Sequence, residues 1–246
     1  MSEAVDKIKA LIDDCTPEDQ IILLDYLKAR FPQHPLEKEW GVISDVILSA
    51  ITRSSDLTKR GVRGIIAEAI FAEKTLAPLI ESGWEAIQFL NDRPYDFLIR
   101  RDSREVRIQV KLQRMEKGVP KIASKRRYPS ETDLYVVEVQ KTRGGKNKVT
   151  NENTRPYRFG EFDILAVNMH PSTKDWTKFQ FAVGDWLLPR DEDPALIEIM
   201  QPVSPSPTDT WTDQLETCIE WLVKGEQKRI LRVDPALVKP KIRNSN

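Results

Sequence analysis

The chain has 246 residues, which is long enough to bury a sizeable core in one large domain or in one domain with an appendage. Its 38 basic and 38 acidic residues cancel, so affinity for nucleic acid would require an uneven distribution of charge. Cys15 and Cys218 lie outside any CxxC or Cys/His cluster, which argues against a disulfide framework and a structural zinc site. No stretch approaches the roughly 18 apolar residues of a membrane span. Acids near the amino terminus argue against a signal peptide, so we expect a soluble, cytoplasmic protein with no membrane partner.

The first part of the chain, 1–56, has helical periodicity and is expected to form a helical N-terminal region. Thr16 has the position of an N-cap, followed by Pro17 at the first helical position and by acids in the first turn. Pro32 ends that helix, and another helix is predicted over 36–52. This region is either a cap that packs on the core or an element for dimerisation or for clasping DNA.

A longer helix is predicted over 58–82, where apolar residues recur at helical spacing from Ile65 to Leu76. Glu68 lies within this apolar stretch, where burial of a carboxylate is costly unless it is paired or bound to a metal ion. An exposed position for Glu68 is the other interpretation, and Glu73 is available on a neighbouring turn. Gly83 closes the helix.

A strand is predicted over 84–90, and a turn then leads into a hairpin over 95–114, in which two apolar runs flank a polar break. Asp96 lies on the first run, and Gln109 and Lys111 lie on the second. Residues i and i+2 of a strand share a face, so Gln109 and Lys111 are expected to point together. The hairpin could therefore hold an acid, an amide and an amine around one small pocket.

The segment from Arg100 to Arg158 contains 17 Lys and Arg against 7 Asp and Glu. Its basic residues concentrate in two expected loops, 115–129 and 141–148, on either side of a buried strand at 134–140. Basic and amide groups next to tyrosines suit contacts to phosphates and base edges, although the same loops also fit an ordinary solvated surface. The candidate DNA-binding residues are Arg114, Lys125, Arg126, Arg127, Gln140, Lys141, Arg143, Lys146, Arg155, Tyr157 and Arg158.

Further strands are predicted at 162–168 and 176–183, and they would extend a central mixed β-sheet of about five or six strands flanked by helices, an α/β fold. Residues 189–207 are rich in proline and acids and are predicted to be an irregular connection with a short helix at 195–200. A last helix is expected at 211–223. The chain is thus divided into a helical N-terminal region, an α/β core with basic loops, and a C-terminal connection, helix and tail: 1–56, 57–190 and 191–246.

The tripeptide PYD at 94–96 is followed, after twelve residues, by QVK at 109–111. This pattern resembles the PD-(D/E)xK signature at the core of many restriction endonucleases. Tyr95 stands between the Pro and the Asp, and Gln109 stands where the family usually has Asp or Glu, although members with QxK exist. The resemblance implies a restriction-endonuclease-like core that begins with one helix and three strands, the order that periodicity also predicts here.

The resemblance also implies roles for the candidate residues in a Mg²⁺ site. Asp96 would be the principal metal ligand, and Glu68 a second or water-mediated ligand on the helix before the first core strand. Gln109 would contribute its side-chain carbonyl, and its neutral amide should weaken metal binding relative to a carboxylate. Lys111 would orient the attacking water or stabilise charge on the phosphate. Magnesium would act as Lewis acid and template.

Together these features predict a sequence-specific, Mg²⁺-dependent endonuclease for double-stranded DNA, of the type II restriction class. Two histidines, His34 and His170, are too few for a His-based metal cage, and GxSxG, GxxxxGK[ST] and GxGxxG motifs are absent. The resemblance favours a homodimer, because a twofold axis matches a symmetric DNA site. It also implies that the protein works alongside a separate DNA methyltransferase. The alternatives are a DNA repair or structure-specific nuclease, a catalytically inactive DNA-binding protein on the same fold, and an intracellular protein-interaction module.

Overall fold

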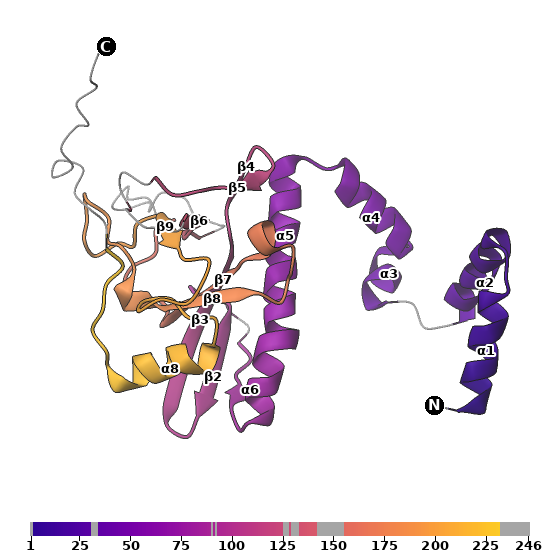
Figure 1. Cartoon of the computed structure of the whole chain (residues 1–246), viewed down its shortest axis with the longest axis horizontal. Helices are drawn as coiled ribbons and strands as arrows, with labels where there is room; N and C mark the ends of the chain where they lie inside the picture. The colour runs from indigo at the N-terminus through magenta and orange to yellow at the C-terminus, as the bar shows by residue number, and fades with distance from the viewer. Residues whose placement is uncertain are drawn as a thin grey trace, which may run out of the picture. The chain divides into compact units, whose positions relative to one another are not determined.

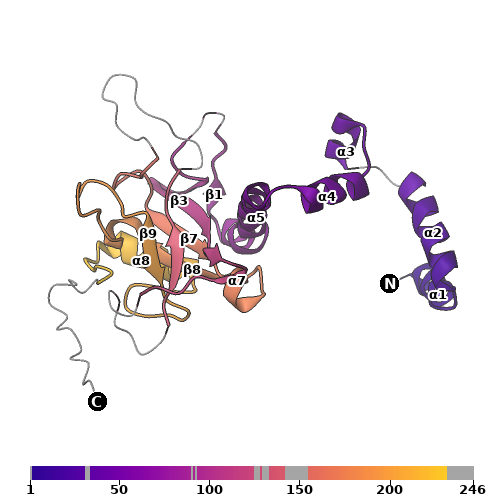
Figure 2. The same ribbon diagram turned by 90° about the horizontal axis from the view of Figure 1, so that it is seen from above.

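The computed structural model describes residues 2–30, 34–89, 91, 93–124, 128, 133–141 and 155–231 (Figures 1 and 2). The chain divides into two compact units, one spanning residues 1–60 and the other residues 61–246. The second unit contains both clusters of buried hydrophobic side chains. Among the helices in the described ranges, none is long and apolar enough to cross a membrane.

The first unit contains α1 (Glu3–Asp13), α2 (Pro17–Arg30), α3 (Pro35–Trp40) and α4 (Ser44–Arg53). The predicted N-cap at Thr16 is confirmed, because its Oγ1 accepts the backbone N–H of Asp19 at 3.2 Å. His34 caps α3, since its Nδ1 accepts a backbone N–H of the first turn at 3.1 Å. The helix predicted over 36–52 is interrupted at Gly41, whose positive φ of 65° ends α3. None of the described side chains of α1, α3 and α4 is buried.

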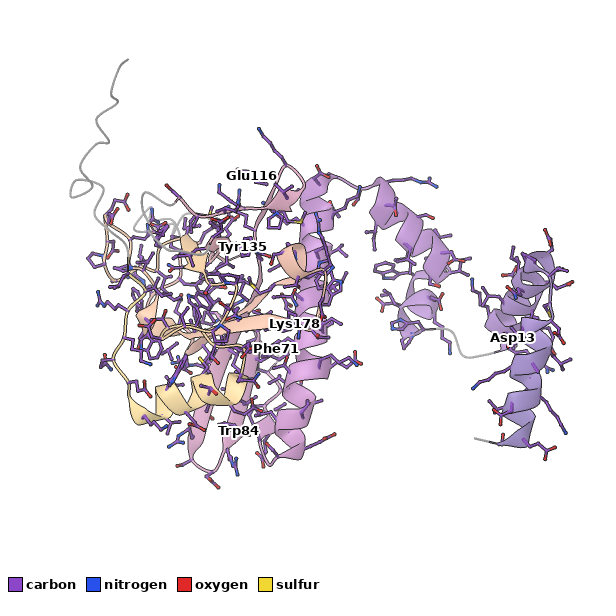
Figure 3. All side chains as sticks on the ribbon, viewed as in Figure 1. Asp13, Phe71, Trp84, Glu116, Tyr135 and Lys178 are labelled. Carbon is purple, nitrogen blue, oxygen red and sulfur yellow. The ribbon has the colours of Figure 1, made fainter. Side chains whose placement is uncertain are left out.

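A continuous helical segment confirms the helix predicted over 58–82. It consists of α5 (Asp56–Ile70), a π-helical turn (Phe71–Leu76) and α6 (Ala77–Glu81). Phe71 (labelled in Figure 3) is fully buried, and its ring centroid lies 5.1 Å from that of Phe97 and 5.5 Å from that of Phe179. Such aromatic contacts stabilise beyond the burial of their apolar area, so they hold one face of the helical segment against the sheet.

The central sheet has five strands in the order β1-β2-β3-β7-β8. Its strands are β1 (Glu85–Ala86), β2 (Phe97–Arg101), β3 (Arg104–Leu112), β7 (Ile164–Asn168) and β8 (Phe179–Val183). β3 and β7 run parallel and the other neighbours run antiparallel, so the sheet is mixed. The predicted α/β class and the predicted hairpin are therefore confirmed, whereas the strand predicted over 84–90 is reduced to β1. The hairpin turns at Asp102, where φ is 55°.

Helices cover one face of this sheet, and a second, two-stranded sheet covers the other (Figure 1). On the helical face, α5, α6 and α8 (Leu215–Lys224) pack in one cluster with Val110. On the opposite face, β6 (Tyr135–Glu138) pairs antiparallel with β9 (Met200–Val203), and Val137 joins one cluster with Leu165 and Val167. The strand predicted over 134–140 is thus β6, which belongs to the second sheet.

The short helix predicted over 195–200 is wrong. Ile197 forms an isolated bridge with Pro189, and its N–H donates to the carbonyl of Tyr157 at 2.8 Å. Only 1% of Ile197 is exposed, so burial between two extended segments outweighs the local helical pattern. The remaining short elements are β4 (Met115–Glu116), β5 (Val119–Pro120), α7 (His170–Thr173) and a 3₁₀ turn (Gly184–Trp186).

Gly184 marks a close approach between two backbone segments. A Cβ atom at this position would lie 2.7 Å from the carbonyl oxygen of Phe162. We expect Gly184→Ala to lower the free energy of unfolding by about 1–3 kcal/mol, because backbone atoms must move to admit the methyl group. Gly64→Ala is the control, since a Cβ there meets nothing within 4 Å and alanine is favoured over glycine in a helix. Urea denaturation measures both variants, and an unchanged midpoint for Gly184→Ala would contradict the close approach.

Candidate active site

The β2–β3 hairpin divides its side chains between the two faces of the sheet. Ile108 and Val110 belong to the core under the helices, so Gln109 and Lys111 point to the opposite face, as strand alternation predicts. Asp96 immediately precedes β2, and its backbone N–H donates to the Ile108 carbonyl at 3.0 Å. The acid, the amide and the amine therefore come together at the end of the hairpin that lies away from its turn.

A chain of hydrogen bonds runs from Tyr157 through Gln109 to Asp96. The Tyr157 hydroxyl donates to Gln109 Oε1 at 3.1 Å, and Gln109 Nε2 donates to Asp96 Oδ2 at 2.5 Å. The same carboxylate oxygen accepts the backbone N–H of Val110 at 2.8 Å. Gln109 is only 1% exposed, and a buried amide is costly unless both of its polar atoms are bonded. This chain meets that requirement and fixes the orientation of the Asp96 carboxylate.

Three ionisable groups of this cluster have shifted pKa values, and burial is the largest cause of each shift. Burial, and then the charge of Asp96, raise the pKa of Glu68 to about 7, while Lys111 opposes the shift. Burial raises the pKa of Asp96 against the opposing effects of Lys111 and the Val110 N–H. Burial lowers the pKa of the Lys111 ammonium, although both carboxylates favour its charged form. Glu68 of α5 is therefore brought to the hairpin, as its place in an apolar stretch suggested.

Glu73, the other acid considered on this helical segment, makes a different contact. Its exposed carboxylate pairs with the ammonium of Lys74 at 2.7 Å. The charges of Asp96 and Lys111 act on Glu68. Glu68 is thus the carboxylate that the helix supplies to the cluster.

The oxygen atoms of the cluster fit a hard cation such as Mg²⁺, which is held through one or two carboxylates with phosphate oxygens and water completing its shell. Glu68 and Asp96 supply two carboxylates, and Asp96 Oδ1 accepts no hydrogen bond from any residue in the described ranges. The described side chains include no group of three or more His, Cys, Asp and Glu arranged for a metal ion. Gln109 presents its NH₂ group to Asp96, so its carbonyl could bind a cation only if the amide turned.

Acidic side chains hold several of the predicted DNA-binding residues. Arg114 and Gln140 both contact the carboxylate of Glu138, and Lys141 pairs with Glu161 at 2.7 Å. Part of the predicted positive surface is therefore neutralised within the protein. Arg155 and Arg158 also lie in the described ranges, whereas five candidates lie outside the described residues: Lys125, Arg126, Arg127, Arg143 and Lys146.

Tyr157 is a predicted DNA contact that the structure places inside the cluster. It is 4% exposed, and its ring centroid lies 5.6 Å from Lys111 Nζ and 5.3 Å from Lys141 Nζ. Burial, and then the charge of Asp96, raise the pKa of its hydroxyl, so the hydroxyl remains a donor. Tyr157 and Gln109 are 48 residues apart in sequence, and no local pattern signals their contact.

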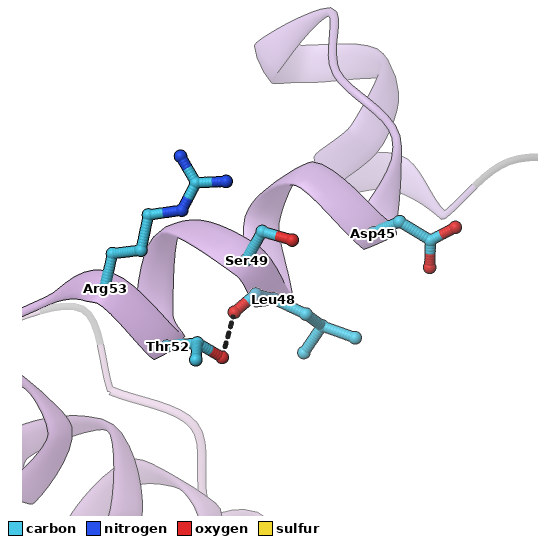
Figure 4. A pocket seen from close by; sticks show the side chains of 5 residues that line it. All are labelled: Asp45, Leu48, Ser49, Thr52 and Arg53. Atoms are coloured by element: carbon cyan, nitrogen blue, oxygen red, sulfur yellow. Dashed lines mark hydrogen bonds between the residues drawn. The ribbon is translucent and has the colours of Figure 1, made fainter.

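A surface depression in the N-terminal unit offers less chemistry than the hairpin cluster. One helix lines it, through Asp45, Leu48, Ser49, Thr52 and Arg53 of α4 (Figure 4). The Thr52 hydroxyl donates to the Leu48 carbonyl at 2.9 Å, and Asp45 pairs with Lys28 at 3.0 Å. These are ordinary helix and surface contacts, so the hairpin cluster is the candidate active site.

Comparison with known proteins identifies no family for this chain. No protein-family model and no curated protein match it. Among solved structures, the chain is similar to a bacterial homing endonuclease, I-Ssp6803I, with 18% sequence identity and a TM-score of 0.37 over 67% of this chain and 94% of that one. At this identity and TM-score the likeness assigns neither an activity nor residue roles to this chain.

The raised pKa of Glu68 should couple stability to pH. Its pKa is about 7 in the folded chain against an ordinary 4.5, so folding favours the protonated form. The resulting stabilisation is complete below about pH 4.5 and is lost as the pH rises through about 7. Glu68→Gln imitates the protonated form. The free energy of unfolding of this variant, relative to that of the wild type, should therefore increase as the pH rises from about 4.5 to about 7.

Urea titrations at several pH values, without divalent cations, measure this difference. Glu73→Gln is the matched control, because it removes an exposed carboxylate from the same helical segment and leaves the cluster intact. A difference for Glu68→Gln that is the same at low and neutral pH would contradict the assignment.

Proposed function

We propose that the chain is a Mg²⁺-dependent endonuclease of the restriction type, which hydrolyses phosphodiester bonds of double-stranded DNA at a specific sequence. The observation that carries this proposal is the set of shifted pKa values of Glu68, Asp96 and Lys111 at the β2–β3 hairpin, which burial and charges within the cluster produce. Perturbed ionisable groups gather at functional sites more often than elsewhere. Two carboxylates can hold a cation and an ammonium can stabilise phosphate charge, and phosphodiester hydrolysis needs both.

Each residue of the cluster has a distinct role in this proposal. Asp96 and Glu68 would hold the Mg²⁺ ion through their carboxylates, and Lys111 would orient the attacking water or stabilise charge on the phosphate. When bound, Mg²⁺ lowers the pKa of a water molecule and polarises phosphate oxygens. Because Gln109 is neutral, the site has one negative charge fewer than a site with three acids, and its affinity for the cation should be lower.

Duplex DNA is the proposed substrate, and its phosphates would be attracted by the basic segment between Arg100 and Arg158, with 17 Lys and Arg against 7 Asp and Glu. Lys141 lies beside the cluster and could exchange its contact with Glu161 for one with a phosphate. Phosphate contacts release counterions, so binding should weaken steeply as salt is added.

Loss of Asp96 is the direct test of the proposed activity. We expect the wild type to cleave plasmid DNA in Mg²⁺, and Asp96→Asn or Lys111→Met to lower the rate at least roughly 100-fold. Asp96→Asn removes a charged ligand of the proposed cation, and Lys111→Met removes the charge that would act on the phosphate or the water. Glu73→Gln, on the same helical segment as Glu68 but outside the cluster, should cleave like the wild type. Sequencing the fragment ends then tests specificity, since a shared sequence at the ends is expected. Full activity of Asp96→Asn would refute the assignment.

A catalytically inactive DNA-binding protein on the same fold is the second candidate. The neutral amide of Gln109, at a position where the resembled nucleases usually have an acid, favours it. The plasmid assay separates the two candidates. Salt-sensitive binding of duplex DNA without cleavage in either Mg²⁺ or Mn²⁺ would support the inactive protein.

A twofold homodimer in the cytoplasm, alongside a separate DNA methyltransferase, is the simplest proposed assembly for cutting both strands of a symmetric site. The charges of α2 support pairing of two copies. Glu18 and Asp19 lie in its first turn, and Lys28 and Arg30 in its last. An antiparallel pair of α2 helices would place the acids of each copy near Arg30 of the other and would cover exposed side chains such as Ile22, while Lys28 keeps its pair with Asp45.

Light scattering after gel filtration tests this assembly. We expect a mass of twice 28.4 kDa for the wild type, and a shift toward one chain for Ile22→Asp, because a charge in the apolar interface is costly. Leu231→Asp is the control, since it places the same charge on an exposed apolar residue of the second unit. A wild-type mass of one chain that persists on cognate DNA would exclude the homodimer.

A further inference from the structure

We propose that Tyr157 is a positioning residue, whose hydroxyl fixes the Gln109 amide so that Gln109 holds one oxygen of Asp96 and leaves the other for a divalent cation. This inference rests on the proposed function, because the carboxylate being positioned is the proposed metal ligand. It assigns to Gln109 the role of a donor to Asp96 in place of the predicted role of a carbonyl ligand.

The orientation of the Gln109 amide follows from its neighbours. Gln109 Nε2 lies 2.5 Å from Asp96 Oδ2 and 3.2 Å from the Val110 carbonyl oxygen. Both neighbours are acceptors, so the reverse orientation would set the amide oxygen against two other oxygens. Gln109 Oε1 must then face Tyr157, whose hydroxyl donates to it at 3.1 Å. The tyrosine thus occupies one lone pair of the atom that could otherwise act as a metal ligand.

Packing holds Tyr157 in place independently of this hydrogen bond. Its ring makes an edge contact with Phe162, with centroids 5.3 Å apart, and both residues are buried. The ammonium groups of Lys111 and Lys141 also lie near the ring, at 5.6 and 5.3 Å from its centroid. Tyr157 therefore contacts the amine of the cluster through its ring and the acid through its hydroxyl and Gln109.

These two contacts can be separated by substitution. Tyr157→Phe keeps the ring and removes only the hydroxyl, so Gln109 loses its donor and Asp96 loses a fixed partner. Groups that orient a metal ligand typically contribute about 10–100-fold to metal affinity. We therefore expect Tyr157→Phe to weaken binding of Mn²⁺ to the DNA-free protein by about 10–100-fold.

Tyr135→Phe is the matched control, because it removes a phenol hydroxyl from β6 in the same layer, and its Mn²⁺ affinity should match that of the wild type.

Calorimetric titration of the full chain with Mn²⁺ measures the affinities, and circular dichroism with thermal melting confirms that each variant is folded. Wild-type Mn²⁺ affinity in a folded Tyr157→Phe variant would overturn the inference. A loss that Tyr135→Phe shares would overturn it as well, because it would indicate a general packing effect.

The side-chain NH₂ resonances of Gln109, measured by NMR without metal, keep this inference distinguishable from the proposed function. They should shift in Tyr157→Phe and remain in place in Tyr135→Phe, whether or not the chain cleaves DNA. Resonances that do not shift in Tyr157→Phe would overturn the positioning role. A third outcome is that the wild type binds no Mn²⁺ and cleaves no DNA, while the Gln109 resonances still shift in Tyr157→Phe. This outcome would overturn the proposed function and the cation role. Tyr157 would then remain a positioning residue for Gln109 alone.

Discussion

The hydrogen bond from the Val110 N–H to Asp96 Oδ2, at 2.8 Å, is the contact on which the geometry of the candidate site depends. Asp96 also donates its backbone N–H to the Ile108 carbonyl at 3.0 Å, so its main chain and its side chain are both tied to β3. The same strand carries Gln109 and Lys111. A half-buried carboxylate bonded to a strand backbone has little freedom to turn, and the acid, amide and amine therefore keep fixed relative positions.

The register of β3 in the sheet is consequently as important as the residues themselves. β3 pairs in parallel with β7 over five positions, and Arg107 holds both carboxylate oxygens of Asp163 just before β7. A slip of one residue would bring Val110 to the site and turn Gln109 into the core, because alternate side chains of a strand point to opposite faces. Burial of Ile108 and Val110 under the helices opposes that slip. The hydrophobic core and the site are thus specified by the same pairing.

Sequence patterns predicted the parts of this arrangement that depend on neighbouring residues. Strand alternation placed Gln109 and Lys111 together, and the apolar surroundings of Glu68 indicated an acid that needs a partner. Contacts between distant segments could not be predicted in this way. The bond between Tyr157 and Gln109 is an example, since it joins residues 48 positions apart. Residues 195–200 illustrate the other limit, because short apolar runs fit a helix or an extended segment equally well until the partner at Pro189 is known.

The neutral amide at position 109 also has an electrostatic consequence. In a half-buried cluster, a third carboxylate would add repulsion to a pair in which Asp96 already raises the pKa of Glu68. The single ammonium of Lys111 would then face three negative groups, and one of them would take up a proton. Gln109 avoids this repulsion and donates a hydrogen bond to Asp96 that no carboxylate could supply. Compared with a carboxylate at this position, Gln109 gives up an oxygen ligand and gains a fixed orientation of Asp96. The proposed metal site would therefore depend on the geometry of two carboxylates, whereas a site with three acids depends on its charge.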